Sequence, residues 1–152
     1  MTNFDSLKGT VDHINSVRQK IFIVVNDFLD RALKHDLSKT ESPEKEGYDI
    51  YTPKLRDTEY GSKKYWDTLK EMQPFLDHHY QNNRHHPEFF VDEIDGMNLL
   101  DLLEMMCDWK AAGERHANSS MLKSIEINAE RFNMSPQLKQ ILQNTASYLG
   151  WI

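Results

Sequence analysis

The chain has 152 residues, a formal net charge of −6 and a single cysteine, Cys107. This length is typical of one domain, and the acidic balance argues against a protein that coats nucleic acid or a membrane surface, because both attract basic proteins. One cysteine cannot form an intramolecular disulfide, and residues 1–10 lack the apolar stretch of a signal peptide. The longest aliphatic run, residues 21–25, is too short to span a bilayer. We therefore expect a soluble, cytoplasmic protein.

Apolar residues that recur every three or four positions predict a first helix over residues 14–37. This periodicity is lost over residues 40–62, which contain two prolines, two glycines and many charges. A connection of this length is usually functional or partly ordered, so we expect a flexible or lid-like segment. A short helix is predicted to begin within it at Ser42-Pro43.

The rest of the chain carries the signals of several further helices. Ser62 is placed to cap one helix, and Pro74 either kinks that helix or begins the next. Ser135 and Pro136 together are typical of a helix start. The sequence contains no alternating strand pattern and no repeat, so we predict a single all-α domain of about six helices over residues 1–152. The later predicted helices cover residues 63–73, 74–83, 97–117, 121–132 and 137–149.

Charged residues interrupt the most apolar of these helices, residues 97–117. The helix is apolar around most of its circumference, which implies burial. Its charged stripe nevertheless contains Asp101, Glu104, Asp108 and Arg115. Buried carboxylates are costly unless they are paired or bound to a metal, so the stripe indicates either an internal ion pair of Glu104 or Asp108 with Arg115, or a metal site.

Four of the seven histidines lie within residues 78–86, "HHYQNNRHH". Such pairs either cover a surface or converge on a centre that needs nitrogen ligands. A His-Asp doublet, His35-Asp36, offers adjacent nitrogen and oxygen ligands near the predicted end of the first helix. The helix C-terminus alone also favours histidine and lysine, so the doublet by itself is a weak signal.

The order of these residues along the chain resembles the HD-domain superfamily of metal-dependent phosphohydrolases. The sequence is more closely similar to a small phage and bacterial family described only as a domain of unknown function, through "HDLSK" at 35–39, "HHYQNNRHHPE" at 78–88 and "EMMCDWKAA" at 104–112. The resemblance implies an HD-like helical bundle that holds one or two divalent ions of Mn, Fe, Co, Ni or Zn. If the chain is phage-encoded, its place is the host cytoplasm. The implied metal ligands are His13, His35, Asp36, His79, His86 and Asp108.

Two geometric conditions follow from this ligand set. His13 and His35 are 22 residues apart, which is about 33 Å along an unbroken helix, so a shared ion requires a break, for which Asn26-Asp27 is the candidate. The continuous apolar spacing through that point argues against the break.

The second condition concerns the two histidine pairs. We expect a helix over residues 74–81, a left-handed turn at Asn82-Asn83, and a return of the chain that Pro87 keeps free of helix. His79 and His86 are then expected within about 5 Å of the Asp108 carboxylate.

The resemblance implies a metal-dependent phosphohydrolase that acts on a nucleotide or a related phosphate ester, with neither nucleic acid nor membrane as a partner. The predicted catalytic residues are Asp36, Lys39 and Glu104, and the predicted substrate-binding residues are His78, Arg84, His85, Lys110 and Arg115. One alternative is a non-catalytic, phage-type protein in which the metal supports binding of a nucleotide or a partner. A minor alternative comes from "HHPE" at 85–88, which resembles the signature of pterin carbinolamine dehydratase, a metal-free α/β enzyme.

Overall fold

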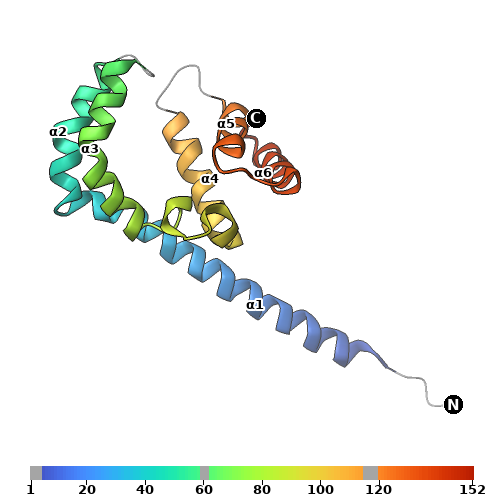
Figure 1. Cartoon of the computed structure of the whole chain (residues 1–152). Helices are drawn as coiled ribbons and strands as arrows, with labels where there is room; N and C mark the ends of the chain where they lie inside the picture. Colours follow the sequence, from blue (N-terminus) through green and yellow to red (C-terminus); the bar gives the residue numbers. More distant parts are fainter. Residues whose placement is uncertain (1–4, 59–61, 115–119) are drawn as a thin grey trace. The chain divides into compact units, whose positions relative to one another are not determined.

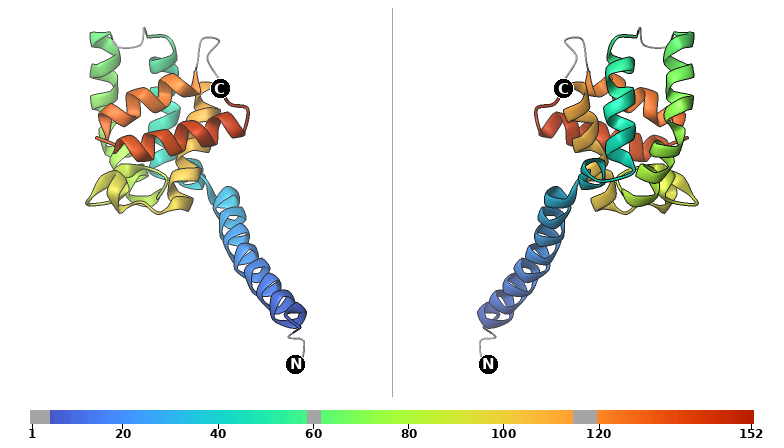
Figure 2. Two further views of the ribbon diagram at one scale, coloured as in Figure 1. Left: turned by 90° about the vertical axis from the view of Figure 1, so that its right-hand side faces the viewer. Right: turned by 90° about the vertical axis from the view of Figure 1, so that its left-hand side faces the viewer.

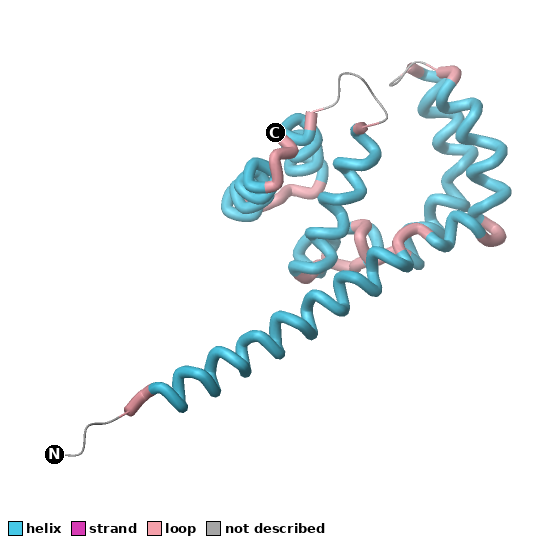
Figure 3. Tube along the Cα trace, turned by 180° about the vertical axis from the view of Figure 1, so that it is seen from behind, coloured by secondary structure: helices cyan, strands magenta, loops and turns pink. Residues whose placement is uncertain are grey.

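The structure is a computed structural model that describes residues 5–58, 62–114 and 120–152. Within these ranges it contains six α-helices, three short 3-10 helices and no strand, which confirms the predicted all-α class (Figures 1 and 3). The α-helices are α1 (Leu7–Lys34), α2 (Glu44–Arg56), α3 (Lys63–Asn82), α4 (Leu99–Gly113), α5 (Met121–Arg131) and α6 (Pro136–Tyr148). The 3-10 helices are η1 (Leu37–Thr40), η2 (Pro87–Phe89) and η3 (Glu93–Gly96).

The chain separates into two units, residues 1–35 and residues 36–152, and each is described by itself. Of the helices that the structure describes, none is both long enough and apolar enough to span a membrane.

The first unit consists of the single helix α1, which is continuous from Leu7 to Lys34. The predicted break at Asn26-Asp27 is therefore wrong. Asp27 remains helical and accepts a hydrogen bond from Arg31 Nε at 3.4 Å, an (i, i+4) contact that supports a helix. Because the helix is unbroken, His13 and His35 are about 33 Å apart along it and cannot bind the same ion.

In the second unit, α2 and α3 form an antiparallel pair (Figure 1). They approach so closely at Gly47 that a Cβ atom there would lie 2.3 Å from Cγ of the Phe75 ring. Helix α3 begins at the predicted cap, where the Ser62 hydroxyl accepts a hydrogen bond from Tyr65 N. It then runs through Pro74 without ending, so residues 63–73 and 74–83 belong to one helix.

The hydrophobic core of the second unit lies between α4, α5 and α6. The last two helices lie side by side, and α6 begins at the predicted Ser135 cap with Pro136 in its first turn (Figure 2). Apolar residues of α4 bury one face of that helix, although Leu99 at its start is 74% exposed. The core residues are Ile94, Leu102, Met105, Met106, Met121, Ile125, Ala129, Phe132, Met134, Leu142 and Ala146.

The segment between α3 and α4 turns the chain back as predicted. Helix α3 ends at Asn82, but Asn83 is extended, with φ −128°, so the expected left-handed turn is wrong. Pro87 begins η2, a single 3-10 turn, and no α-helix forms between α3 and α4. Arg84 anchors this segment through two hydrogen bonds to the fully buried Asp101 carboxylate, of 3.1 and 3.0 Å.

A pair of isoleucines on α5 tests the placement of the core. Ile125 is 0% exposed, so Ile125→Ala is expected to lower the free energy of unfolding. The loss is about 2–5 kcal/mol, because the truncation leaves a cavity. The same substitution at Ile127, which is 54% exposed, is the control. It should change the unfolding free energy by less than about 0.5 kcal/mol. Urea denaturation followed by circular dichroism measures both, and equal losses would show that the core face is misassigned.

Candidate metal centre

Asp36 begins the second unit in an unusual backbone conformation. Its φ of 58° and ψ of 13° are left-handed, a region that non-glycine residues seldom adopt and that aspartate tolerates better than most. Strained residues of this kind concentrate at functional sites. The side chain is held by Lys39, whose Nζ lies 2.6 Å from Oδ2, which leaves Oδ1 to face the histidines.

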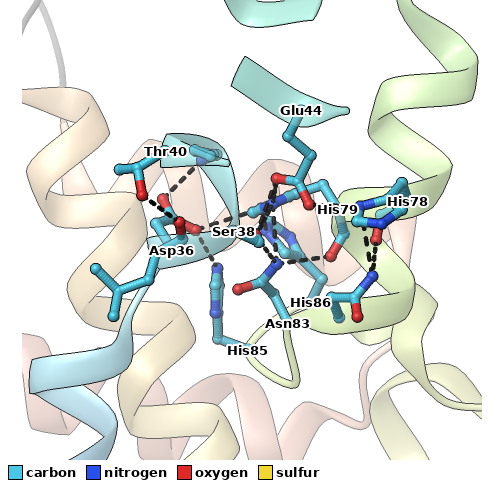
Figure 4. Close-up of polar contacts among 12 residues, drawn as sticks. Asp36, Ser38, Thr40, Glu44, His78, His79, Asn83, His85 and His86 are labelled. Carbon is cyan, nitrogen blue, oxygen red and sulfur yellow. Dashed lines mark hydrogen bonds and ion pairs between the residues drawn. The ribbon is translucent and has the colours of Figure 1, made fainter. Parts of the chain in front are cut away.

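Three histidines from the end of α3 and the following segment surround that oxygen (Figure 4). The Nε2 atoms of His79 and His85 each lie 3.4 Å from Asp36 Oδ1. The Nε2 atoms of His79 and His86 are 2.9 Å apart. All four residues can place one ligand atom within 4.8 Å of every other. His79 and His85 are each 1% exposed, whereas Asp36 and His86 are partly exposed, so the cluster is half-buried and keeps a side toward solvent.

A buried carboxylate fixes the orientation of His79. Glu44, at the start of α2, is 0% exposed, and its Oε2 lies 2.8 Å from His79 Nδ1. Burial raises the pKa of Glu44, but hydrogen bonds from His78, His79 and Ser38 outweigh it, so the pKa lies below its usual value. An ionised carboxylate can only accept, so Nδ1 of His79 carries the proton and donates it. The lone pair of His79 is then on Nε2, directed at the centre.

The second oxygen of Glu44 and the adjoining polar groups complete this support. His78 Nδ1 lies 2.8 Å from Glu44 Oε1, and the Ser38 hydroxyl donates to Oε2 at 2.9 Å. The Asn83 amide donates to the Ser38 hydroxyl and to the backbone oxygen of His79, each at 2.8 Å (Figure 4). These contacts join η1, α2 and the end of α3 around one carboxylate.

Two acids of α4 approach the same cluster. Glu104 Oε1 lies 3.3 Å from His85 Nδ1, a position from which it can orient that ring. A carboxylate oxygen of Asp108 lies within 4.8 Å of one of Asp36. The buried charges of α4 thus have different neighbours: Asp101 pairs with Arg84, Glu104 contacts His85, and Asp108 lies near Asp36.

The distances among the four clustered side chains fit a single transition-metal ion. Ligands about 2.0–2.1 Å from a tetrahedral ion are about 3.3 Å from one another. The measured separations among His79, His85, His86 and Asp36 include 2.9, 3.4 and 3.4 Å. Three nitrogens and one oxygen also suit Mn, Fe, Co, Ni or Zn better than Mg or Ca.

The lowered pKa values of two of the histidines also favour the binding of a metal ion. Burial, together with the neighbouring His85 and His79 rings, lowers the pKa of His86 to about 3. Burial and the positive charge of Lys39 also lower the pKa of His79, against the opposing hydrogen bond to Glu44. Both imidazoles are therefore neutral near pH 7, which is the form that binds metals.

Comparison with known proteins places the chain in a family. Residues 2–148 match the model of a family of unknown function, DUF5662. The chain belongs to the DUF5662 family. No significant match was found among curated proteins or among solved structures. The family description assigns no function to its members, so the predicted relation to HD-domain enzymes stays a prediction.

Three cations among the remaining predicted site residues of this DUF5662 protein each contact an acidic side chain. Lys39 binds Asp36 and lies 5.1 Å from the centre of the Tyr48 ring. Lys110 Nζ lies 3.2 Å from Oε1 of Glu114, the C-cap residue of α4. Arg84 is held by Asp101, as described above. These contacts leave their predicted roles toward substrate as predictions, and Arg115 lies outside the described residues.

Two of the predicted ligands, His13 and His35, belong to the first unit. His35 is the C-cap residue of α1 and precedes Asp36 directly, and its role as a ligand stays a prediction. His13 is exposed on α1, far along the helix from His35. The predicted approach of His79 and His86 to Asp108 also stays a prediction, whereas both histidines lie close to Asp36.

Sequence analysis missed the carboxylate that supports the histidines. Glu44 is one of several acids in a charged segment without periodicity, so nothing distinguishes it before α2 packs against α3. Ser38 and Asn83 do lie within the motifs at 35–39 and 78–88, which was an available signal. His85, expected to bind substrate, joins the cluster as a fourth potential ligand.

The metal content of the purified protein tests the centre directly. We expect about one or two divalent transition-metal ions per chain, by the number of nitrogen and oxygen ligands. Asp36→Ala and His79→Ala should both lose the metal, because each removes a ligand. His13→Ala, on α1, should retain it. Elemental analysis measures all four proteins, and an absence of metal from the wild type, with no thermal shift on adding Mn, Co, Ni or Zn, would rule out the centre.

A substitution at Glu44 tests its supporting role. Glu44→Gln keeps the size of the side chain but replaces one carboxylate oxygen by an NH2 group, which cannot accept from the histidine that faces it, and it removes the negative charge. The affinity for the metal is expected to fall by roughly 10–100-fold, the usual effect of removing such support. Glu46→Gln, an exposed position on the same helix, is the matched control. Competition with a chromogenic chelator measures the affinities, and equal values in both variants would contradict the role.

Proposed function

We propose that this DUF5662 protein is a metal-dependent phosphohydrolase that acts on a nucleotide or a related phosphate ester. The observation that carries the proposal is the convergence of three histidine nitrogens on Asp36 Oδ1, next to two acids of α4. The order of these residues along the chain resembles that of an HD-type site, which supports the same reaction class. A divalent ion bound there would supply a Lewis acid, which polarises a phosphoryl oxygen and increases the acidity of water.

The side chains divide the work of such a reaction among them. His79, His85, His86 and Asp36 would hold the ion. Asp108 is close enough to Asp36 to orient a water molecule and accept its proton, the role of a general base. Glu104 holds the ring of His85 through Nδ1, and Lys39 holds Asp36 in its left-handed conformation.

One observation favours a second candidate, a non-catalytic protein in which the metal is structural. Four side chains, Asp36, His79, His85 and His86, form one group, and four protein ligands complete the coordination of a tetrahedral ion. Catalytic zinc sites usually keep one position for water. A closed centre would support binding of a nucleotide or a partner without hydrolysis. The all-α fold of the described residues does not fit pterin carbinolamine dehydratase, which is an α/β enzyme.

A substrate screen tests the proposal. Protein loaded in turn with Mn, Fe(II), Co, Ni or Zn is incubated with nucleoside mono-, di- and triphosphates, cyclic nucleotides, dinucleotides and a chromogenic ester. Hydrolysis of at least one is expected. Asp108→Ala should reduce the rate by roughly 100-fold or more, because it removes the proposed base.

The control for this experiment is Glu114→Ala, at the exposed C-cap position that follows the same helix, which should keep full activity. Metal content is measured in every variant, so that loss of the ion is separated from loss of the base. A metal-loaded wild-type protein that hydrolyses none of these compounds would overturn the proposal and favour the closed, non-catalytic centre.

A further inference from the structure

Helix α1 makes up almost the whole described part of the first unit and contains no buried residue. Its 28 residues give it a length of about 42 Å. Helices in water gain most of their stability by packing an apolar face. Seven apolar side chains on one side of α1 are nevertheless each between 41% and 65% exposed: Leu7, Val11, Ile14, Val17, Ile21, Val24 and Val25. This side of α1 is therefore suited to a partner.

The apolar side of α1 follows the repeat of a coiled coil. The spacing of its central residues alternates between three and four, and all of them are apolar except Thr10. We call these residues the α1 row: Leu7, Thr10, Ile14, Val17, Ile21, Val24 and Phe28. A seven-residue apolar repeat keeps one row of side chains against a partner helix that winds around it. The repeat thus indicates that the partner of the α1 row is another long helix.

Two opposite charges flank the α1 row on the same side. Lys20 directly precedes Ile21, and Asp27 directly precedes Phe28, one repeat later. Both residues are exposed, and the side chain of Asp27 is 52% exposed although it accepts a hydrogen bond from Arg31. Charges at these flanking positions determine which helices pair and in which orientation.

The order of the two charges fits an antiparallel second copy of α1. When Ile21 of one copy lies opposite Val24 of the other, Lys20 comes within two residues of the level of Asp27 in the other copy. Two residues are about 3 Å along the helix axis, which is close enough for an ion pair. The two-fold symmetry of such a pair repeats the contact, so the interface gains two ion pairs.

Other arrangements of the same two helices lose this match. A slip of the antiparallel pair by one repeat places Lys20 beside Lys20 in one direction and Asp27 beside Asp27 in the other. In a parallel pair, Lys20 faces Val25 and Asp27 faces Ala32, so neither charge has a partner across the interface. The charges of α1 therefore favour one orientation and one register.

We propose that α1 is a dimerisation helix that pairs antiparallel with α1 of a second copy of this chain through the α1 row. In the favoured register, Val17 of one copy lies opposite Phe28 of the other, next to the layer of Ile21 and Val24. The symmetry repeats both layers, so the centre of the interface is apolar. The inference does not depend on the proposed function, because α1 carries its own interface.

The mass of the full-length protein in solution is the first test. Analytical ultracentrifugation over a wide range of protein concentration should give the mass of two chains, with dissociation to one chain on dilution. A wild-type protein with the mass of one chain at every concentration would overturn the proposal.

Charge reversal tests the orientation and the register. Lys20→Asp and Asp27→Lys each replace two ion pairs by two like-charge contacts, so each should weaken the dimer by about tenfold or more. The double variant exchanges the two charges and should restore an affinity close to that of the wild type. A dimer that is unaffected by both single reversals, or that the double variant does not restore, would overturn the proposal.

Asp12→Lys is the matched control for charge reversal. Asp12 lies on the opposite side of α1 from the row and pairs with Lys8 at 2.6 Å, an (i, i+4) contact like that of Asp27 with Arg31. This variant makes the same change of charge and loses the same kind of contact within the helix. It should leave the dimer unchanged, and a loss of affinity equal to that of Asp27→Lys would contradict the proposed interface.

Two neighbouring isoleucines test the apolar row. Ile21→Asn places a polar group in the centre of the interface and should abolish the dimer, whereas Ile23→Asn should preserve it. Ile23 is 64% exposed and lies on the opposite side of α1 from the row. A dimer that survives Ile21→Asn would overturn the proposal. A monomeric wild type whose melting temperature falls on Ile21→Asn would also overturn it, and would show that α1 packs against the second unit of its own chain.

Discussion

The arrangement of the centre depends on one buried negative charge, that of Glu44. A carboxylate that is 0% exposed is unfavourable unless nearly every lone pair is satisfied, and here three donors satisfy it. The same hydrogen bonds fix the tautomer of His79 and hold η1, α2 and α3 together. A charge that is costly by itself therefore specifies both the local fold and the direction of a ligand.

The close contact between α2 and α3 makes this possible. Glu44 lies in the first turn of α2, and the absence of a side chain at Gly47, one turn later, lets the Phe75 ring pack against the backbone. A larger residue at this position would push the two helices apart and move the carboxylate away from the histidines. Packing about one turn away therefore sets the geometry at the centre.

The sequence predicted the helices best where their ends carry specific signals. Ser62 and Ser135 cap the helices that begin beside them, as expected. The break at Asn26-Asp27 was wrong because it was inferred from the need to bring His13 to a shared ion, against a continuous apolar period that the structure follows. Local periodicity was the stronger evidence, since it reports on the helix itself.

The candidate site was predictable to the extent that its chemistry is concentrated in sequence. The clustering of His79 with His86 could be expected from the two histidine pairs, whereas Glu44 could not, because its role exists only once two helices have packed. The same limit applied to Asp101, for which no partner was predicted and which pairs with Arg84 from a neighbouring segment. The sequence shows which residues carry a charge that must be paired when it is buried. It does not show which residues, brought close by folding, will pair with that charge.

The cluster supplies four ligand atoms, so the identity of a bound metal would decide whether any coordination position remains open. Asp36 offers one oxygen to the histidines because Lys39 binds the other, so the group provides four ligand atoms. Zinc in a structural site is satisfied by four, and the same side chains would then form a closed centre. An ion such as Mn or Fe(II), which accepts more ligands, would keep positions for water and for a phosphoryl oxygen. A carboxylate oxygen of Asp108 lies within 4.8 Å of one of Asp36, which is close enough for the two acids to share such a water. The choice between a structural and a catalytic centre therefore depends on which ion the same four side chains select.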